Sequence, residues 1–142
     1  MEFVNRSYPD IFPVDCPPEE AKHEKITVYR MVKDKIILPD DFKSYVELGK
    51  KYTPTKKPKY GEYAVSVNPN YEELDKYRRS VPFLKKEFKY IAVGDTYLCT
   101  GAICIDKSKR QPSHHEWWLF KEAVPHKYFK VVEGSEICND TE

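Results

Sequence analysis

The eight-residue run SHHEWWLF at positions 113–120 constrains the fold of this chain more than any other segment. Its bulky aromatic content favours an extended strand, in which successive side chains point to opposite faces of a sheet. The two faces would be His114, Glu116 and Trp118 on one side, and His115, Trp117 and Leu119 on the other. An imidazole, a carboxylate and an indole on one face are typical of a small-ligand pocket. We expect the other face to belong to the core.

Alternating apolar segments elsewhere predict the rest of a sheet. Further strands are predicted at residues 26–32, 63–67, 88–93, 96–105 and 129–133. Gly94-Asp95 suits a tight turn, so residues 88–105 are predicted to form a β-hairpin. A helix is predicted to begin at Pro39-Asp40-Asp41 and to continue to about Lys50, and a second helix is predicted over residues 71–79. Asn70 with Glu73 resembles a capping box for the second helix.

This mixed order of elements predicts an α+β fold. We expect a mostly antiparallel mixed sheet of five to six strands, with two or three short helices, in a single domain. Residues 1–24 hold four prolines and little periodicity, so they are predicted to form an irregular N-terminal arm. The domain itself is predicted to span residues 25–133, and residues 134–142 are predicted to be a C-terminal tail.

Composition excludes some classes of protein and leaves others open. The formal net charge of +1 in 142 residues provides no global field for nucleic acid or a membrane surface. No apolar run approaches the length that spans a bilayer, so we expect no membrane partner. The four cysteines include no close CxxC pair, which is typical of free thiols in a reducing cytoplasm.

A metal site is the weaker interpretation of the run at 113–120. Imidazole and carboxylate both bind metals. Adjacent histidines on a strand point to opposite faces, however, so only His114 would join Glu116. Further ligands would have to come from His23, His126 or a cysteine, none of which lies at a diagnostic spacing. We therefore expect no metal.

Arg30 lies inside a predicted strand, on the face otherwise formed by apolar residues such as Val28 and Val32. A guanidinium on such a face must be paired or must hold an anion. The structural interpretation is an ion pair with an acid such as Glu47 or Glu62. The functional interpretation is a clamp for a phosphate or carboxylate.

The order Arg30, Ser66 and Glu116, each on its own predicted strand, resembles the arginine–serine–glutamate pattern of ADP-ribosyltransferases. The resemblance rests on these three residues. It implies an NAD-using transferase in which the arginine holds NAD phosphate, the serine braces the nicotinamide half and the glutamate supports an oxocarbenium-like transition state. The chain has the run AVSV at 64–67 where a Ser-Thr-Ser run is usual, and His114 where the family has a second acid.

Three functions remain open at this point. The first is a small intracellular enzyme or binding domain for a nucleotide-like anion, with NAD as its candidate cofactor. Its catalytic candidates are Glu116, His114 and Arg30, and its ligand-binding candidates are Ser66, Trp118 and Tyr29.

The second function is a non-catalytic module that binds nucleic acid or a protein through tyrosines and two basic loops, Lys50–Lys59 and Lys107–Arg110. The third is a structural partner in which both tryptophans simply belong to the hydrophobic core.

Overall fold

The computed structural model describes residues 7–50 and 60–137 of the chain. In this part of the chain there are six strands and two α-helices. Their bounds are β1 Thr27–Val32, β2 Val65–Val67, α1 Tyr71–Ser80, α2 Pro82–Glu87, β3 Tyr90–Asp95, β4 Gly101–Ile105, β5 His115–Leu119 and β6 Lys130–Val131. Three short 3-10 turns lie at Pro39–Phe42, Gly61–Tyr63 and Pro125–Lys127.

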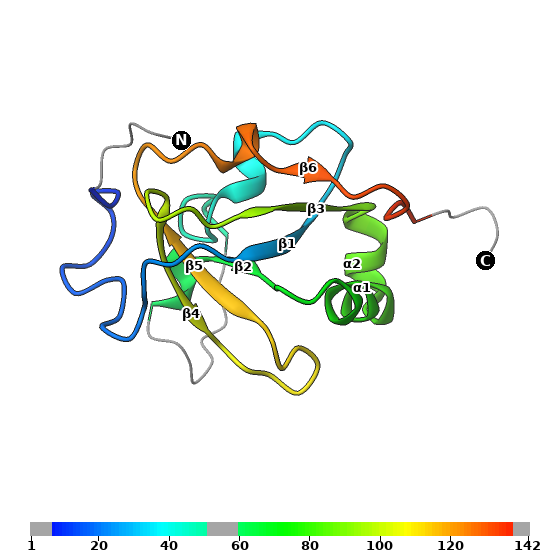
Figure 1. The fold of residues 1–142 in the computed structure, drawn as a ribbon, viewed down its shortest axis with the longest axis horizontal. Helices are drawn as coiled ribbons and strands as arrows, with labels where there is room; N and C mark the ends of the chain where they lie inside the picture. The colour runs from blue at the N-terminus through cyan, green and yellow to red at the C-terminus, as the bar shows by residue number, and fades with distance from the viewer. Residues whose placement is uncertain (1–6, 51–59, 138–142) are drawn as a thin grey trace.

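The strands form two antiparallel sheets of three, ordered β1-β3-β6 and β2-β5-β4. The predicted α+β fold in a single domain is therefore confirmed. One bridge joins the sheets, because the Tyr29 and Asn68 backbones exchange N–H···O bonds of 2.8 and 3.0 Å. This bridge holds β1 of one sheet beside β2 of the other, and the β4–β5 pair runs obliquely to β1 and β3 (Figure 1).

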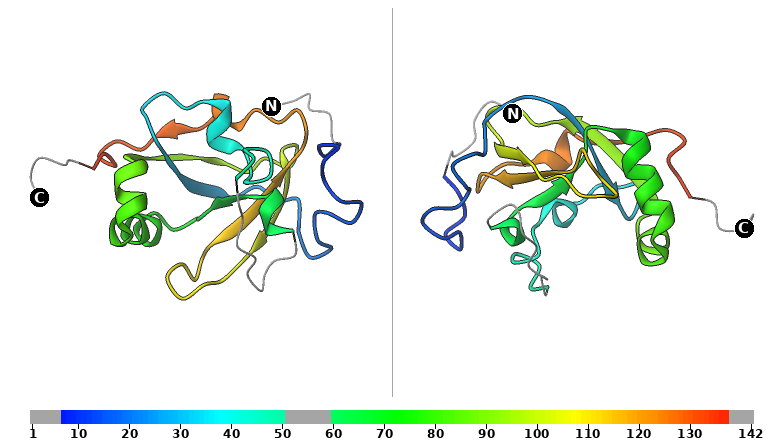
Figure 2. Two further views of the ribbon diagram at one scale, coloured as in Figure 1. Left: turned by 180° about the vertical axis from the view of Figure 1, so that it is seen from behind. Right: turned by 90° about the horizontal axis from the view of Figure 1, so that it is seen from below.

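Apolar residues from both sheets fill one core. Its buried members include Val28 and Val32 of β1, Val65 and Val67 of β2, Ala92 of β3, Ile103 of β4 and Trp117 of β5, with Phe42 and Phe129 from the connections. The predicted core face of the run at 113–120 is thus the core face in the structure: Trp117 is buried there and Leu119 packs against it. The two helices lie at one end of the sheets, opposite the N-terminal arm (Figure 2).

The hairpin predicted over residues 88–105 is wrong. Gly94 and Asp95 lie inside β3 rather than in a turn, and β3 and β4 belong to different sheets. The glycine is needed for packing, because a Cβ at Gly94 would overlap the ring of Phe129. The chain leaves β3 at Thr96, whose hydroxyl donates to the carbonyl of Glu24 at 2.8 Å.

The helix predicted from Asp41 to about Lys50 is also wrong. The structure has a 3-10 turn at Pro39–Phe42, and Lys43 leaves it in an extended conformation. The Asp41 carboxylate accepts the Leu38 N–H at 2.7 Å, and Phe42 is buried in the core. Burial of that one ring and the local side-chain bond outweigh the apolar spacing that favoured a helix.

The helix predicted at residues 71–79 is confirmed as α1. The Asn70 side chain accepts the Glu73 N–H at 3.0 Å and so caps the helix. The helix ends before Val81, and a second helix, α2, begins immediately with Pro82 at its first position.

Both ends of the described chain pack on the domain. Residues 7–24 of the arm form turns, and Cys16 is buried beside Trp118 in a second apolar cluster. At the other end, Ser135 and Ile137 are buried. The fully buried Arg78 of α1 donates to the carbonyl of Ser135 at 2.8 Å, so the start of the segment predicted as a tail is bonded to α1.

Candidate functional site

Arg30 is held on the core face of β1 by backbone oxygens from two other segments. Its Nε donates to the Asp41 carbonyl at 2.5 Å, and its Nη1 donates to the Ser66 carbonyl at 2.7 Å. The guanidinium lies over the ring of Phe42, with Cζ 5.7 Å from the centroid. Burial lowers the pKa of Arg30 to about 10, against the opposing effect of Asp41, so the side chain remains a cation at neutral pH. Both hydrogen bonds go to uncharged oxygens, and the Asp41 carboxylate acts on the guanidinium only through its charge.

Ser66 and Glu116 face each other across β2 and β5. The two residues are register partners in the antiparallel pair, and the Ser66 hydroxyl donates to Glu116 Oε1 at 3.5 Å. Glu116 is only 5% exposed. Burial above all, together with the charge of Asp106, raises the pKa of Glu116 to about 8, against the opposing effects of the Ser66 bond and the Arg30 charge. Glu116 is therefore mostly protonated at pH 7.

Arg30, Ser66, His114 and Glu116 line one cavity of about 570 Å³. The first two come from neighbouring strands of different sheets, and the last two come from the run at 113–120. The bridge between β1 and β2 places the sheets so that these side chains meet. The size is within the range of ordinary ligand pockets, about 300–1,000 Å³.

His114 lies beside Asp106, the residue that follows β4. The His114 Nδ1 is 3.2 Å from the Asp106 carbonyl oxygen and 3.4 Å from its Oδ2. Burial lowers the pKa of His114, against the opposing charge and hydrogen bonds of Asp106. The imidazole is therefore mostly neutral at pH 7.

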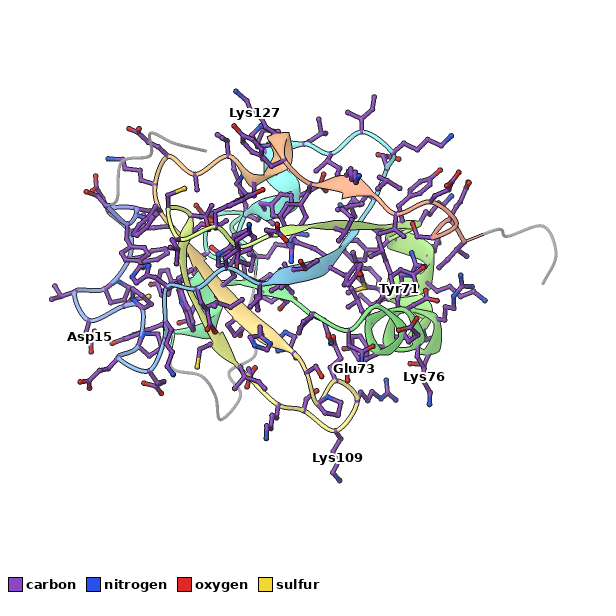
Figure 3. All side chains as sticks on the ribbon, in the orientation of Figure 1. Asp15, Tyr71, Glu73, Lys76, Lys109 and Lys127 are labelled. Atoms are coloured by element: carbon purple, nitrogen blue, oxygen red, sulfur yellow. The ribbon has the colours of Figure 1, made fainter. Side chains whose placement is uncertain are left out.

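A buried amide network supports the loop before His114. Asn68 Nδ2 donates to Glu73 Oε2 at 2.8 Å and to Gln111 Oε1 at 3.0 Å. The same Glu73 oxygen accepts the Ser113 N–H at 2.7 Å. Glu73 on α1 thus connects the helix to the β4–β5 loop, whose tip carries Lys109 (Figure 3). The network fixes the backbone from which His114 enters the cavity.

Trp118, one of the predicted ligand-binding residues, lies outside the lining of that cavity. It is fully buried in the second cluster with Cys16 and Ala64, and Tyr8 and Phe12 of the arm pack against the cluster. Its Nε1 donates to the Tyr60 carbonyl at 3.1 Å. The structure therefore places this indole beneath the N-terminal arm.

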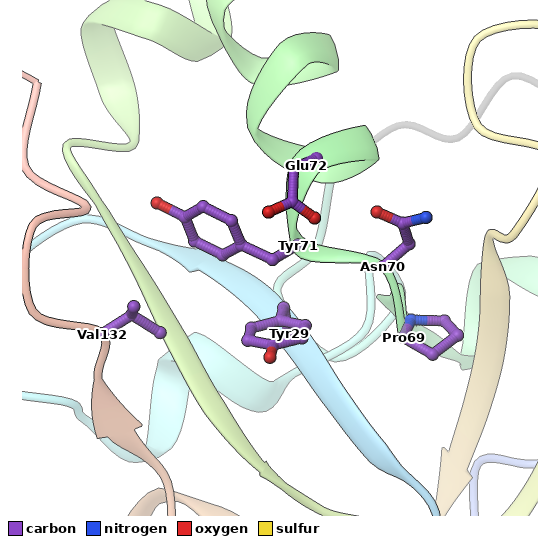
Figure 4. A pocket seen from close by; sticks show the side chains of 6 residues that line it. All are labelled: Tyr29, Pro69, Asn70, Tyr71, Glu72 and Val132. Atoms are coloured by element: carbon purple, nitrogen blue, oxygen red, sulfur yellow. The ribbon is translucent and has the colours of Figure 1, made fainter.

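Tyr29, the other predicted ligand-binding aromatic, lies next to Arg30 in β1 and therefore points to the opposite face. It lines a separate cavity of about 460 Å³ with residues at the start of α1 (Figure 4). Its ring makes an edge contact with Tyr71, with centroids 5.4 Å apart. The structure does not bring Tyr29 together with Glu116.

The remaining predicted features are distributed as follows. Among the described residues, no group of three or more histidines, cysteines or acids is placed to hold a metal. His115 donates from Nδ1 to the Ser113 carbonyl at 2.8 Å, across the strand from His114.

Residues 107–110 are exposed, whereas residues 51–59 of the other basic loop lie outside the described residues. No helix in the described part is long and apolar enough to cross a membrane.

Two residues of the site, Asp41 and Asp106, were not among the candidates predicted from the sequence. Asp41 supplies the carbonyl that holds Arg30, and Asp106 lies against His114. Asp106 could have been found from strand pairing, because β4 and β5 form a hairpin in which the Asp106 N–H donates to the His114 carbonyl at 2.7 Å. No local signal indicated Asp41, since its role depends on the path of the chain after β1.

Comparison of the chain with protein-family models, with curated proteins and with solved structures finds no match.

Proposed function

We propose that the cavity binds NAD or a related nucleotide, and that the chain is a transferase similar to the ADP-ribosyltransferases. The observation that carries the proposal is the meeting of Arg30, Ser66 and Glu116 in one cavity. They come from three strands and two sheets, so their proximity does not follow from closeness in the sequence.

Arg30 is the proposed anion-binding residue. Its bonds to the carbonyls of Asp41 and Ser66 use two of its five N–H donors and fix the plane of the guanidinium. A guanidinium held in this way presents its other donors in a fixed fork, which suits the paired oxygens of a phosphate. The diphosphate of NAD is a ligand of this kind.

Glu116 is the proposed electrostatic residue. A positive charge beside a carboxyl favours its ionised form and lowers its pKa. The nicotinamide ring of NAD is cationic, and positive charge moves to the ribose as the bond to nicotinamide breaks. Glu116 would therefore ionise as that charge forms, and Ser66 would orient the carboxylate through the bond to Oε1.

The test measures the melting temperature of the chain with and without NAD, ADP-ribose and inorganic diphosphate. A ligand at 100 times its Kd stabilises the folded state by about 2.7 kcal/mol, so binding raises the melting temperature. We expect Arg30→Ala to abolish the shift produced by all three compounds. Arg110→Ala, at an exposed position, is the matched control and should keep the shift.

Glu116→Gln tests the second role. Gln resembles the protonated carboxyl that predominates at pH 7, so we expect NAD to bind but nicotinamide release to fall by at least about 10²-fold, the scale of an electrostatic catalytic group. Glu122→Gln, on an exposed residue, controls for loss of a carboxylate. A chain that gives no shift with any of the three compounds contradicts the proposal.

Nucleic-acid binding is a second candidate. It is supported by the exposed cations Lys107, Lys109 and Arg110 in the loop that leads to Gln111, which lines the cavity. The same assay with short single-stranded oligonucleotides would then give a stabilisation that falls steeply with salt. Arg110→Ala should weaken that stabilisation while leaving the NAD response unchanged.

A reducing compartment, the cytoplasm, belongs to the same proposal. It is supported by Cys16 and Cys104, whose thiols are free.

A further inference from the structure

The bond between His114 and Asp106 determines which nitrogen of the imidazole carries the proton. A backbone carbonyl can only accept, so the Nδ1 that lies 3.2 Å from the Asp106 carbonyl must be the donor. Asp106 Oδ2, at 3.4 Å, favours the same arrangement. In a neutral imidazole with its proton on Nδ1, the lone pair is on Nε2. His114 is therefore arranged as a base, with its lone pair on Nε2 and its ring held in place by Asp106.

The position of His114 connects this base to the proposed chemistry. His114 and Glu116 are two residues apart on one face of the strand segment, and both line the cavity that Arg30 enters. The side chain of His114 is only 13% exposed. The charged and titratable groups around it are Asp106 from the end of β4, and His115 and Glu116 from its own segment.

We propose that His114 is the general base of the transfer reaction and that the acceptor is an O–H group, either water or a hydroxyl. This inference rests on the proposed NAD-using function and names the nucleophile that it requires. A hydroxyl must lose its proton as it attacks, and a neutral imidazole can take it. A carboxylate acceptor needs no base, and a guanidinium acceptor is far too weak an acid for a histidine to deprotonate.

The step balances as follows. The bond between ribose C1′ and the nicotinamide nitrogen breaks, and its electron pair stays with nicotinamide. The acceptor oxygen forms the new bond to C1′, and its proton passes to His114 Nε2. Glu116 gives up its proton to water as the cationic NAD binds, carries the compensating negative charge while the ribose is cationic, and takes a proton back from water once the neutral nicotinamide has left. The products are nicotinamide, an O-linked ADP-ribose and one proton, which His114 then releases to water.

The test measures nicotinamide release from NAD in water and in water with methanol, where methyl ADP-ribose reports on a hydroxyl acceptor. In His114→Asn the amide N–H can replace the Nδ1 donor toward Asp106, but the side chain is not a base. We expect both products to fall by about 10²-fold or more, the usual effect of removing a general base. The shift in melting temperature with NAD should remain, and added imidazole should restore part of the rate.

His115→Asn is the matched control. It removes an imidazole with the same kind of Nδ1–carbonyl bond from the opposite face of β5. We expect its turnover to stay within about twofold of the parent chain. If His114→Asn keeps the parent rate, the assignment of His114 as the general base is overturned, while the proposed NAD-using function still stands. If the parent chain neither binds nor turns over NAD, both fail.

A measurement without any variant guards against misfolding of His114→Asn. Nitrogen-15 NMR of the unsubstituted protein separates the two tautomers of each neutral histidine. We expect His114 to carry its proton on Nδ1. A proton on Nε2 would overturn the inference whatever the kinetics show, because that nitrogen could not then accept one.

Discussion

The guanidinium of Arg30 is bonded to the carbonyl of Ser66, the residue whose hydroxyl donates to Glu116. One continuous set of contacts therefore runs from β1 of the first sheet to β5 of the second. It connects the Arg30 cation to the buried Glu116 carboxyl through Ser66. The backbone carbonyl of Ser66 bonds to Arg30, and its hydroxyl bonds to Glu116. The stability and the pH response of the domain should both depend on it.

Replacing Glu116 should change how stability depends on pH. The pKa of Glu116 is about 8 in the folded chain, against an ordinary value of 4.5 for a glutamate in an unfolded chain. Below pH 4.5 the group is protonated in both states. Between 4.5 and 8 the folded state keeps a proton that the unfolded state releases, so stability is lost as pH rises. Glu116→Gln should remove this loss of stability. Above pH 8 the unfolding free energy of the variant should therefore exceed that of the parent by on the order of a few kcal/mol.

Denaturation of both proteins from pH 4 to 9 measures the effect. The difference in unfolding free energy between Glu116→Gln and the parent should grow through this window and then level off. A constant difference at all pH values would show that Glu116 is not a buried proton-binding group. Glu122→Gln, at an exposed position, is the control.

Arg30→Lys should cost stability although it conserves the charge. A lysine cannot reproduce the fork that donates to both Asp41 and Ser66, and its ammonium does not stack on Phe42 in the same way. We expect a loss of roughly 1–3 kcal/mol in urea denaturation, since at least one of the two carbonyls loses its partner. Arg110→Lys, in the exposed loop, should change stability by less than about 0.5 kcal/mol. Equal values for the two variants would contradict this role for Arg30.

Gly94→Ala should destabilise the fold through Phe129. The added Cβ would overlap the aromatic ring, and overpacking of this kind typically costs about 1–3 kcal/mol. Phe129→Leu removes the ring, so the double variant Gly94→Ala with Phe129→Leu should lose less than the sum of the single variants. A double-mutant cycle measures this coupling. Strictly additive losses would mean that the two residues do not touch.

Trp118→Phe should reduce stability without changing ligand affinity. The substitution leaves the Tyr60 carbonyl without the indole N–H and opens space in the cluster beneath the arm. We expect a loss of roughly 1–3 kcal/mol in unfolding free energy, with a Kd for NAD within about twofold of the parent value. A large loss of NAD affinity in this variant would instead support the ligand-binding role predicted from the sequence.

Local elements were the most predictable part of this protein. The helix α1 was found because its cap needs only Asn70 and the Glu73 N–H, three residues apart. The turn expected at Gly94 was wrong because a glycine is required there to make room for the ring of Phe129, 35 positions further along the chain. A glycine required by packing cannot be distinguished in the sequence from a glycine required by a turn.

Strand alternation, which can be read from the residues alone, put Glu116 and Trp117 on opposite faces and placed Arg30 on the face shared with Val28 and Val32. It did not determine whether those faces would meet. Tertiary contacts bring Arg30 to Ser66, through the bridge between β1 and β2, and pack residues of the N-terminal arm against the cluster that holds Trp118. Alternation is a property of each strand alone, whereas a site depends on which strands become neighbours.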